Sequence, residues 1–227
     1  MVALAAMVSD RGPARLREPD GAFDVRPLGR TAYEPTWRAM QAFNGARDDA
    51  TRDQLWLTEH EPIYTLGLAG RSEHVLRANG IPVLKVDRGG QVTYHGPGQL
   101  VLYVLADLRR RAPGVRALVR ALEGSVIEWL DSLGISAYAR EKAPGVYVSV
   151  GGAEAKIAAI GLRVAKGCTY HGLAVNVNMD LAPFADIDPC GHRGLAVTHV
   201  AALASPPSLA QAGDALAAIV ARRLEPR

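Results

Sequence analysis

Two side chains in the sequence combine reactive chemistry with an unusual setting. Cys190 lies in the loop Asp188-Pro-Cys-Gly191, outside any helical or apolar pattern, whereas a thiol buried as a small hydrophobe more often lies in an apolar strand, as Cys168 nearly does. Lys156 interrupts the otherwise nearly apolar run of residues 155–161. A nearby cation lowers the pKa of a thiol and so raises its thiolate fraction. We therefore interpret Cys190 as a nucleophile and Lys156 as its cation; a structural thiol and an outward-facing lysine on an edge strand are the alternatives.

A glycine-rich stretch, Arg88-Gly-Gly-Gln-Val-Thr-Tyr-His-Gly-Pro-Gly-Gln99, directly precedes the apolar run Leu100–Leu105. Glycine lets a backbone approach a ligand closely and take positive φ. The polar members of the stretch are donors that a purely structural turn does not need: Arg88, Gln91, Thr93 and His95. We predict a binding loop held between strands, with a plain Gly-Gly hairpin as the alternative.

Two other histidines are predicted to be solvated. His60 lies in Glu59-His-Glu-Pro62, a turn between the strand-like runs Leu55–Leu57 and Ile63–Leu66. Histidine in such a setting is usually exposed or merely structural. His74 has the same interpretation, so neither residue is expected to take part in chemistry.

The periodicity of the sequence predicts helices at residues 31–46, 114–133 and 208–224, where apolar residues recur at three- and four-residue steps. In the second helix, Val115 is assigned to the apolar face and Glu123 to the polar face. Ser208 is placed to cap the third helix.

After the second helix the hydrophobic period shifts to two, and the short glycine turns between consecutive strands make those strands antiparallel. Strands are predicted at residues 55–57, 63–66, 81–86, 100–108, 146–148, 155–164, 169–177 and 195–200. This order of elements favours an α+β fold, with a mixed, mostly antiparallel sheet and flanking helices, over a doubly wound parallel sheet.

The composition is that of a globular protein: 227 residues, 48% of them hydrophobic and 22% charged. We expect a mobile extension at residues 1–24 and a single catalytic domain at residues 25–227. The net charge of +3 comes from scattered Lys and Arg, so we expect no nucleic-acid partner, although a mildly basic face suits an acidic protein partner. No segment is apolar enough to predict a membrane span. Two cysteines without a secretion signal favour reduced thiols in the cytoplasm over a disulfide.

Several motifs, taken in order, resemble those of the lipoyl(octanoyl) transferase family. They are the stretch Arg88–Gln99 quoted above, Ala143-Pro-Gly-Val-Tyr147, Lys156-Ile-Ala-Ala-Ile-Gly161, Gly167-Cys-Thr-Tyr-His-Gly-Leu-Ala-Val-Asn176 with its continuation to Asp180, and Asp188-Pro-Cys-Gly191. Together they span about residues 30–205. The sequence departs from the family at Asp188, where Asn is frequent, at His192, where an aromatic residue is common, and in a slightly longer segment at residues 148–154; these departures concern local loop geometry.

The resemblance implies a biotin/lipoyl protein ligase-like fold and a cytoplasmic acyltransferase of lipoate biosynthesis. Such an enzyme moves an octanoyl group from acyl carrier protein to a lysine of a lipoyl domain through a thioester intermediate, with no cofactor and no metal. The implied acceptors are lipoyl domains of 2-oxoacid dehydrogenase subunits and the glycine cleavage H protein. By the same resemblance, Cys190 would be the acyl-thioester nucleophile, and Lys156 would lower the pKa of its thiol and shuttle protons.

The resemblance also assigns the substrate-binding residues. They are Arg88, Gly89, Gly90, Gln91, Val92, Thr93, Tyr94, His95, Ala159, Ile160, Gly161, Gly172, Leu173 and Ala174. Small residues among them would leave a slot for a straight alkyl chain. Burial of the octanoyl carbons would contribute on the order of 5 kcal/mol, at about 0.8 kcal/mol per carbon. His95 would position the loop or the carbonyl, His171 would support its loop, and His192 and His199 would be structural.

Two other functions remain open from the sequence. An ATP-dependent lipoate or biotin ligase of the same fold would use the glycine loop and Lys156 to bind an acyl-adenylate and would need no cysteine. A zinc-binding protein would use Cys168-x-x-His171 and Cys190-x-His192, although these spacings miss the usual paired-cysteine pattern. Replacing Cys190 with serine separates the transferase from the ligase, and metal analysis would detect zinc.

Overall fold

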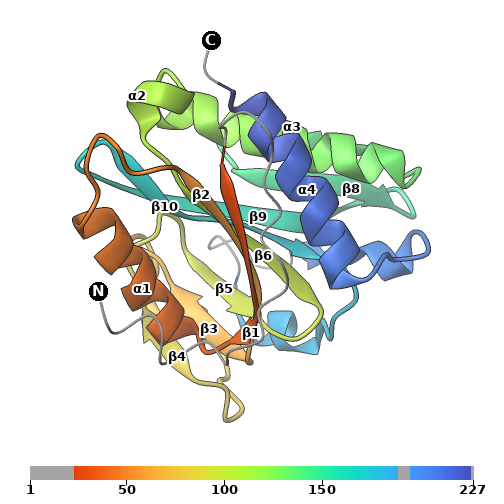
Figure 1. The fold of residues 1–227 in the computed structure, drawn as a ribbon. Coiled ribbons are helices and arrows are strands. Elements are labelled where there is room, and N and C mark those ends of the chain that lie inside the picture. The colour runs from red at the N-terminus through yellow and green to blue at the C-terminus, as the bar shows by residue number, and fades with distance from the viewer. Residues whose placement is uncertain (1–22, 189–194, 226–227) are drawn as a thin grey trace.

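The main sheet is assembled from strands that are far apart in the sequence (Figure 1). In the computed structural model, which describes residues 23–188 and 195–225, eight strands form this sheet in the order β1-β2-β6-β10-β9-β8-β7, with β11 paired to β9. The strands are β1 (Asp24–Thr31), β2 (Gln54–His60), β6 (Gln99–Leu105), β7 (Ala137–Ala139), β8 (Gly145–Val150), β9 (Ala153–Ala165), β10 (Cys168–Asn176) and β11 (Ala196–Val197). The pairs β1–β2 and β9–β11 are parallel and the others are antiparallel. The predicted mixed, mostly antiparallel α+β fold is confirmed.

A second, three-stranded sheet carries the glycine-rich stretch. Its order is β4-β3-β5, with β3 at Ile63–Leu66, β4 at Val83–Lys85 and β5 at Val92–His95. β5 therefore lies inside the glycine-rich stretch, between its two groups of glycines. The strands β2 and β3, which flank the turn at residues 61–62, belong to different sheets. The chain thus leaves the main sheet at this turn and starts the substructure that holds the loop.

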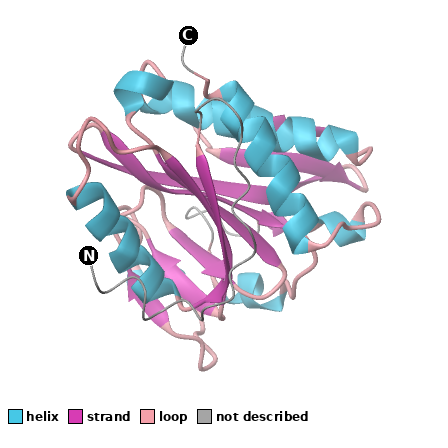
Figure 2. Ribbon diagram, viewed as in Figure 1, coloured by secondary structure: helices cyan, strands magenta, loops and turns pink. Residues whose placement is uncertain are grey.

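Helices cover both faces of the main sheet (Figures 1 and 2). α3 (Val115–Ser132) and α4 (Leu209–Arg223) lie together on one face, and α1 (Tyr33–Gly45) lies on the other. Apolar side chains of α3 and α4 form one core with the sheet: Leu118, Leu122, Trp129, Leu216 and Val220. A second core packs α1 against β2 and β6 and contains Tyr33, Trp37, Met40, Trp56 and Tyr103. The short helix α2 (Leu108–Arg111) and the 3-10 turns at Ser72–His74, Ala182–Asp186 and Val200–Ala202 complete the described elements.

Two predicted helix ends, the start of α4 and the end of α3, are confirmed by the residues that cap them. The Ser208 hydroxyl accepts a hydrogen bond from the Gln211 N–H at 3.2 Å, and the Gln211 side chain accepts one from the Ser208 N–H at 3.0 Å. This reciprocal capping box satisfies two N–H groups that the first turn of a helix leaves unpaired. Gly134, just after α3, has φ +75°, the conformation that favours glycine at a helix C-terminus.

Some predictions from periodicity were wrong in detail. Val115 is 40% exposed and Glu123 is 7% exposed, so the helix faces assigned to these two residues are reversed. The strand predicted at residues 100–108 ends at Leu105, and the strand predicted at 195–200 is reduced to Ala196–Val197. Periodicity depends only on the residues of one helix or strand. Burial also depends on the groups that neighbouring elements pack against that residue, and periodicity carries no information about them.

Candidate active site

An apolar cavity of about 300 Å³ lies between the glycine-rich stretch and the strands β9 and β10. The described residues that the resemblance assigned to catalysis and substrate binding line this cavity, with the exception of Tyr94. They are Arg88, Gly89, Gly90, Gln91, Val92, Thr93, His95, Lys156, Ala159, Ile160, Gly161, Gly172, Leu173 and Ala174. Cys190 lies outside the described residues. Segments that are distant in the sequence are thus brought to one place.

The cavity lies where the outer edge of β9 is open. β8 pairs with β9 as far as Ala159, and the Gly89 N–H then donates to the Leu162 carbonyl oxygen at 2.9 Å. Between these two points, Ile160 and Gly161 have no pairing strand on that side within residues 23–188 and 195–225. The end of one strand and the arrival of a loop therefore leave space along the sheet edge.

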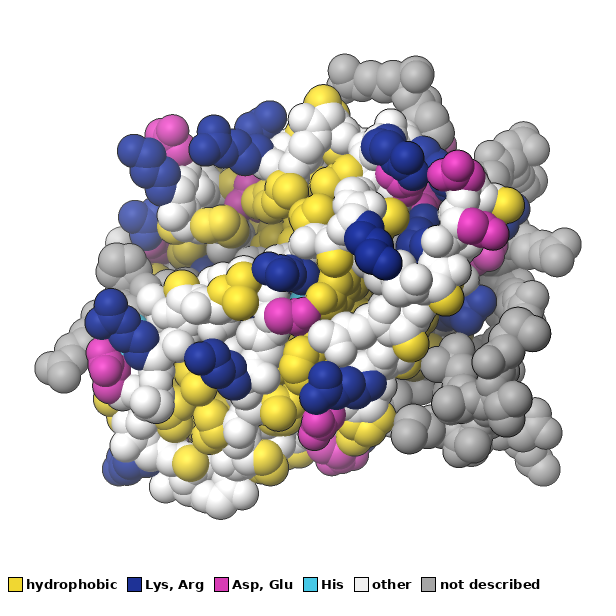
Figure 3. Space-filling model, turned by 90° about the vertical axis from the view of Figure 1, so that its left-hand side faces the viewer, with side chains coloured by type: hydrophobic (Ala, Val, Ile, Leu, Met, Phe, Trp, Pro, Cys, Tyr) yellow, Lys and Arg dark blue, Asp and Glu magenta, His cyan; other side chains and the backbone are white. Residues whose placement is uncertain are grey.

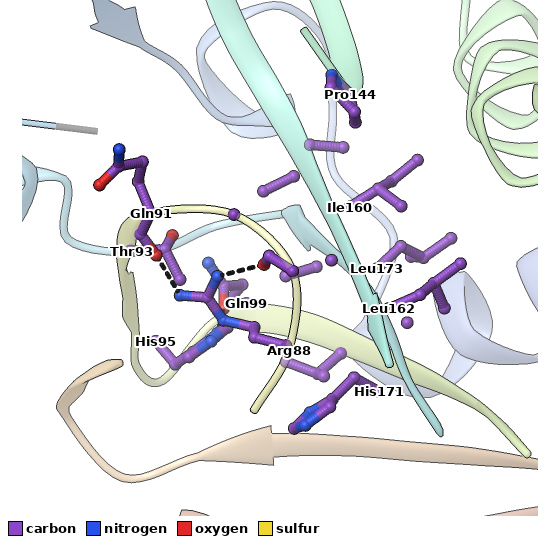
Figure 4. Close-up of a pocket in the computed structure, with 18 of the residues that line it drawn as sticks. Arg88, Gln91, Thr93, His95, Gln99, Pro144, Ile160, Leu162, His171 and Leu173 are labelled. Atoms are coloured by element: carbon purple, nitrogen blue, oxygen red, sulfur yellow. Dashed lines mark hydrogen bonds between the residues drawn. The ribbon is translucent and has the colours of Figure 1, made fainter. Parts of the chain in front are cut away.

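Small side chains keep this space open. Ala159 of β9 pairs with Ala174 of β10 in register, so methyl groups are the largest groups there. A Cβ atom on Gly161 would lie 2.9 Å from the Gly89 carbonyl oxygen, closer than real Cβ contacts, so glycine allows the loop to cross β9. Figure 4 shows Ile160 and Leu173 on one side of the cavity, with the side chains of the glycine-rich stretch opposite them. The result is an apolar slot of the kind that a straight alkyl chain fills.

Arg88 holds the glycine-rich stretch in shape. Its guanidinium donates to the Thr65 carbonyl oxygen at 2.7 Å, to the Gln91 carbonyl oxygen at 2.9 Å and to the Gly89 carbonyl oxygen at 2.9 Å. The side chain is 8% exposed, and Figure 4 shows it beside the cavity. Arg88 was predicted as a donor to a ligand. The structure shows that its guanidinium donates to backbone carbonyls, which fixes the path of a stretch that its glycines would otherwise leave loose; binding of a ligand by Arg88 stays a prediction.

Tyr94 faces away from the cavity. Its ring packs against Tyr64 and Phe184, with centroid distances of 5.6 Å and 5.5 Å. A Cβ atom on Gly96 would lie 2.2 Å from the Tyr94 hydroxyl oxygen, so the glycine after β5 makes room for this ring. Tyr94 is therefore an anchor of the strand β5, and its neighbours Thr93 and His95 point to the other face, as alternation along a strand requires.

A cluster of buried polar rings borders the cavity, and hydrophobic periodicity did not indicate it. His60 is 0% exposed, and its Nε2 lies 2.6 Å from the Tyr103 hydroxyl. The prediction that His60 is a solvated turn residue was therefore wrong. His95 Nδ1 lies 2.7 Å from the Gln99 side-chain oxygen, while the His95 Nε2 is buried with no hydrogen-bond partner in the described part of the chain. The Tyr33 ring stacks on His95 with centroids 5.3 Å apart.

Asp87 ties this cluster to α1. Its carboxylate accepts hydrogen bonds from the Trp37 indole at 2.8 Å and from the Tyr170 hydroxyl, and it lies 3.0 Å from His171 Nε2. Burial alone would raise the pKa of Asp87, but these hydrogen bonds together hold it well below its usual value. Burial lowers the pKa of His171 despite the carboxylate. His171 has a positive φ of 59° inside the strand β10, so the loop that it was predicted to support is not found there.

Burial of His60 makes the stability of the protein depend on pH. In the folded protein burial lowers the pKa of its ring from 6.5 to about 4. The unfolded chain binds this proton more readily, so stability is lost as the pH falls from about 6.5 toward 4. We expect the free energy of unfolding to drop by about 2 kcal/mol from this group between pH 7 and pH 5. Urea unfolding of the wild type and of His60→Gln measures it; an equal drop in both proteins would contradict the prediction.

The environment of His74 differs from the solvated one that was predicted for it. His74 is half-buried, and its Nδ1 lies 3.1 Å from the Gln91 side-chain oxygen, so the solvated interpretation was wrong.

His199 accepts a hydrogen bond from the Met179 N–H at 3.2 Å, which is a structural contact as expected. Cys168 begins β10 and is buried, and burial raises the pKa of its thiol. Cys168 therefore behaves as a small hydrophobe and not as a nucleophile.

Lys156 is buried in the cavity wall. It is 7% exposed and lies on β9 between β8 and β11, so the outward-facing alternative is wrong. Its Nζ lies 5.3 Å from the centroid of the Tyr147 ring on β8, a distance at which a cation is attracted to the ring face. The α-carbon of Gly145 lies so close that an added Cβ would be 2.6 Å from the Lys156 Cε. The amine is thus held in place by the start of β8.

The zinc alternative receives no support from the described residues. Cys190 and His192 lie outside them, and residues 23–188 and 195–225 contain no group of three or more His, Cys, Asp or Glu that could hold a metal ion. Among the helices in the same ranges, none has the length and apolar character needed to cross a membrane.

Comparisons with known proteins agree with this site. Residues 32–221 match the sequence family described as the lipoyl protein ligase A/B catalytic domain. The chain is 62% identical over 181 residues to the octanoyltransferase of Thiobacillus denitrificans, covering 80% of this chain and 81% of the relative. It is 54% identical over 202 residues to the octanoyltransferase of Aeromonas hydrophila, covering 87% and 86% of the two chains. These relatives favour the transferase over an ATP-dependent ligase.

Solved structures confirm the fold. The bipartite lipoate protein ligase of Thermoplasma acidophilum superposes with a TM-score of 0.71 at 20% identity, covering 90% of this chain and 84% of the other. Lipoate-protein ligase A bound with ATP gives a TM-score of 0.70 at 18% identity, covering 92% and 88%. At these identities the likeness establishes a shared architecture, whereas the sequence relatives establish the activity. The chain therefore belongs to the lipoyl protein ligase A/B catalytic-domain family, and within it to the octanoyltransferases, which transfer octanoyl groups in protein lipoylation.

Proposed function

We propose that the octanoyl group comes from acyl carrier protein and passes through a thioester on Cys190 before it reaches a lysine of a lipoyl domain. The observation that supports this most strongly is the position of Lys156. Its amine lies on the wall of an apolar slot, where a cation beside a thiol would raise the thiolate fraction and where a proton carrier is needed.

The chain on both sides of Cys190 is attached to the walls of the cavity. Before it, the Asp188 N–H donates to the His74 carbonyl oxygen at 2.9 Å, and the His74 ring contacts Gln91 in the cavity wall. After it, Val197 pairs with Lys156 and itself lines the cavity. We include in the proposal that the Cys190 thiol lies near the Lys156 amine, and these attachments support it.

In the first half-reaction the Cys190 thiolate attacks the carbonyl carbon of the donor thioester. A carbon–sulfur bond to Cys190 forms, the donor's carbon–sulfur bond breaks, and the departing thiolate takes the proton held on Lys156. One thioester replaces another, so the step is nearly neutral in free energy and needs no ATP. Backbone N–H groups near the glycine-containing loops are the expected donors to the tetrahedral oxyanion.

In the second half-reaction the amine of the lipoyl-domain lysine attacks the acyl-enzyme. A carbon–nitrogen bond forms and the carbon–sulfur bond to Cys190 breaks, which regenerates the thiolate. The acceptor ammonium loses two protons in all: one restores the ammonium of Lys156 and the other goes to solvent. Conversion of a thioester to an amide is downhill and drives the transfer.

The surface is compatible with an acidic donor protein. Figure 3 shows a face of the molecule on which Lys and Arg side chains, with some Asp and Glu among them, lie around an apolar hollow. Acyl carrier protein would present an acidic surface to such a face, and opposite charges raise the rate of encounter. The slot contributes chain recognition, because each buried methylene adds about 0.8 kcal/mol.

The test is intact-mass measurement of the full chain after incubation with octanoyl-acyl carrier protein in the absence of ATP. We expect a gain of one octanoyl group, located on Cys190 by peptide mapping and discharged when a lipoyl domain is added. Cys168→Ser should keep the adduct and Cys190→Ser should lose it. Octanoyl transfer by Cys190→Ser at the wild-type rate, or a strict need for ATP, would overturn the proposal.

A further inference from the structure

Glu123 is a buried carboxylate in the middle of α3, on the face that packs against the sheet. It is 7% exposed, whereas the pattern of the helix predicted a solvent-facing position. Its Oε1 accepts a hydrogen bond from the Gly145 N–H at 3.1 Å. Burying a carboxylate is costly unless it is hydrogen-bonded and paired with charge, so its place in this core needs a reason.

The hydrogen bond from Gly145 connects Glu123 to Lys156. Gly145 has φ +137°, and a Cβ atom there would lie 2.6 Å from the Lys156 Cε and 3.3 Å from its Nζ. The Lys156 side chain therefore packs directly against the backbone of Gly145, the first residue of β8. Glu123 fixes the backbone of that residue from the helix side, while the pairing of Gly145 with Ala159 fixes it from the sheet side.

Glu123 also acts on Lys156 through its charge. Burial raises the pKa of Glu123, and the Gly145 N–H, Arg120 and Lys156 oppose this shift. Arg120 belongs to the same helix as Glu123, whereas Lys156 belongs to β9 of the sheet. On its own side Lys156 faces the ring of Tyr147 from β8. The electrostatic interaction of Lys156 with Glu123 therefore adds to the backbone contact through Gly145.

We propose that Glu123 is a positioning residue of the acyl transfer, which keeps the Lys156 amine in place at the cavity wall and supplies the negative charge that balances it. This inference rests on the proposed roles of Cys190 and Lys156. A glutamine at the same position would accept the Gly145 hydrogen bond equally well. A purely structural helix–strand contact would therefore not need the charge, and the charge is what the test removes.

The test compares Glu123→Gln with Glu128→Gln in the full chain. Glu128 is on the same helix but pairs with Arg222 and Arg223 at the surface, so its variant also loses a carboxylate charge. The readouts are the pH dependence of Cys190 alkylation by iodoacetamide, located by peptide mass, and the pH profile of octanoyl transfer. Loss of a nearby negative charge makes it easier for a neighbouring group to lose its proton. In Glu123→Gln the alkylation curve, and both the acidic and the basic limb of the transfer profile, should therefore move to lower pH by about one unit. kcat should fall about tenfold with KM unchanged.

The outcomes separate this inference from the proposed function. If the wild type forms no acyl-Cys190, the proposed function fails. If the wild type forms it and Glu123→Gln has the pH profile and kcat of Glu128→Gln, Glu123 is only structural and the inference is overturned. Thermal unfolding of both variants shows whether they are folded, and Glu123→Asp, which keeps the charge, should retain the wild-type pH profile.

Discussion

Replacing Lys156 with methionine is expected to lower kcat for octanoyl transfer by roughly 10²–10⁴-fold, the range lost when a positioned proton-transfer group is removed. Methionine keeps an unbranched side chain of similar length, so the contacts with Gly145 and the Tyr147 ring are largely preserved. The amine is lost, and with it the proposed proton carrier and the proposed cation beside the thiol. KM for the octanoyl donor should change by only a few-fold, because the slot itself is intact.

Steady-state assays with octanoyl-acyl carrier protein and a lipoyl domain measure this effect. Lys85→Met is the matched control, because Lys85 is an exposed lysine on the strand β4. It should have wild-type kcat. The assignment of Lys156 fails if its methionine variant, shown to be folded by its thermal transition, turns over at the rate of Lys85→Met.

Much of the fold follows from local patterns. The helices α3 and α4 have regular apolar periodicity and clear capping residues, and both were found where the sequence predicted them. Lys156 was also detectable, because a lysine in an apolar strand has either a charged role or an exposed position. The structure excludes the exposed position, because Lys156 is buried in the cavity wall, and its charged role stays a prediction.

Burial of polar residues by distant segments could not be predicted. His60 lies between two glutamates and would be solvated if local sequence decided, yet Thr31 and Tyr103 approach it from β1 and β6. Glu123 fits the polar pattern of α3, but the first residue of β8 presents an N–H group to it. In each case the partner is remote in the sequence, and hydrophobic periodicity carries no information about it.

The residues of the glycine-rich stretch were predicted as a group, but their individual roles were not. The stretch was expected to offer donors to a ligand. In the structure Arg88 donates to backbone carbonyls, and Tyr94 packs on the opposite side of β5. A stretch rich in glycine needs such internal contacts to keep one conformation, because glycine loses more conformational freedom on folding than other residues. Residue type alone does not distinguish a donor used for this purpose from one left for substrate.

Ala159→Leu is expected to shift the enzyme from octanoyl toward shorter acyl groups. Ala159 lines the cavity beside its paired neighbour Ala174 on β10. A leucine at position 159 therefore fills part of the slot with three additional carbons. If these displace about three methylenes of the substrate, the loss is about 2.4 kcal/mol, or about 50-fold in kcat/KM for the octanoyl donor. A butanoyl donor, which does not reach as far into the slot, should lose much less, so the ratio of the two rates is the decisive measurement. Ala153→Leu, an exposed position on the same strand, is the control and should leave that ratio unchanged. An equal loss for both donors in Ala159→Leu would mean that the acyl chain does not lie along β9.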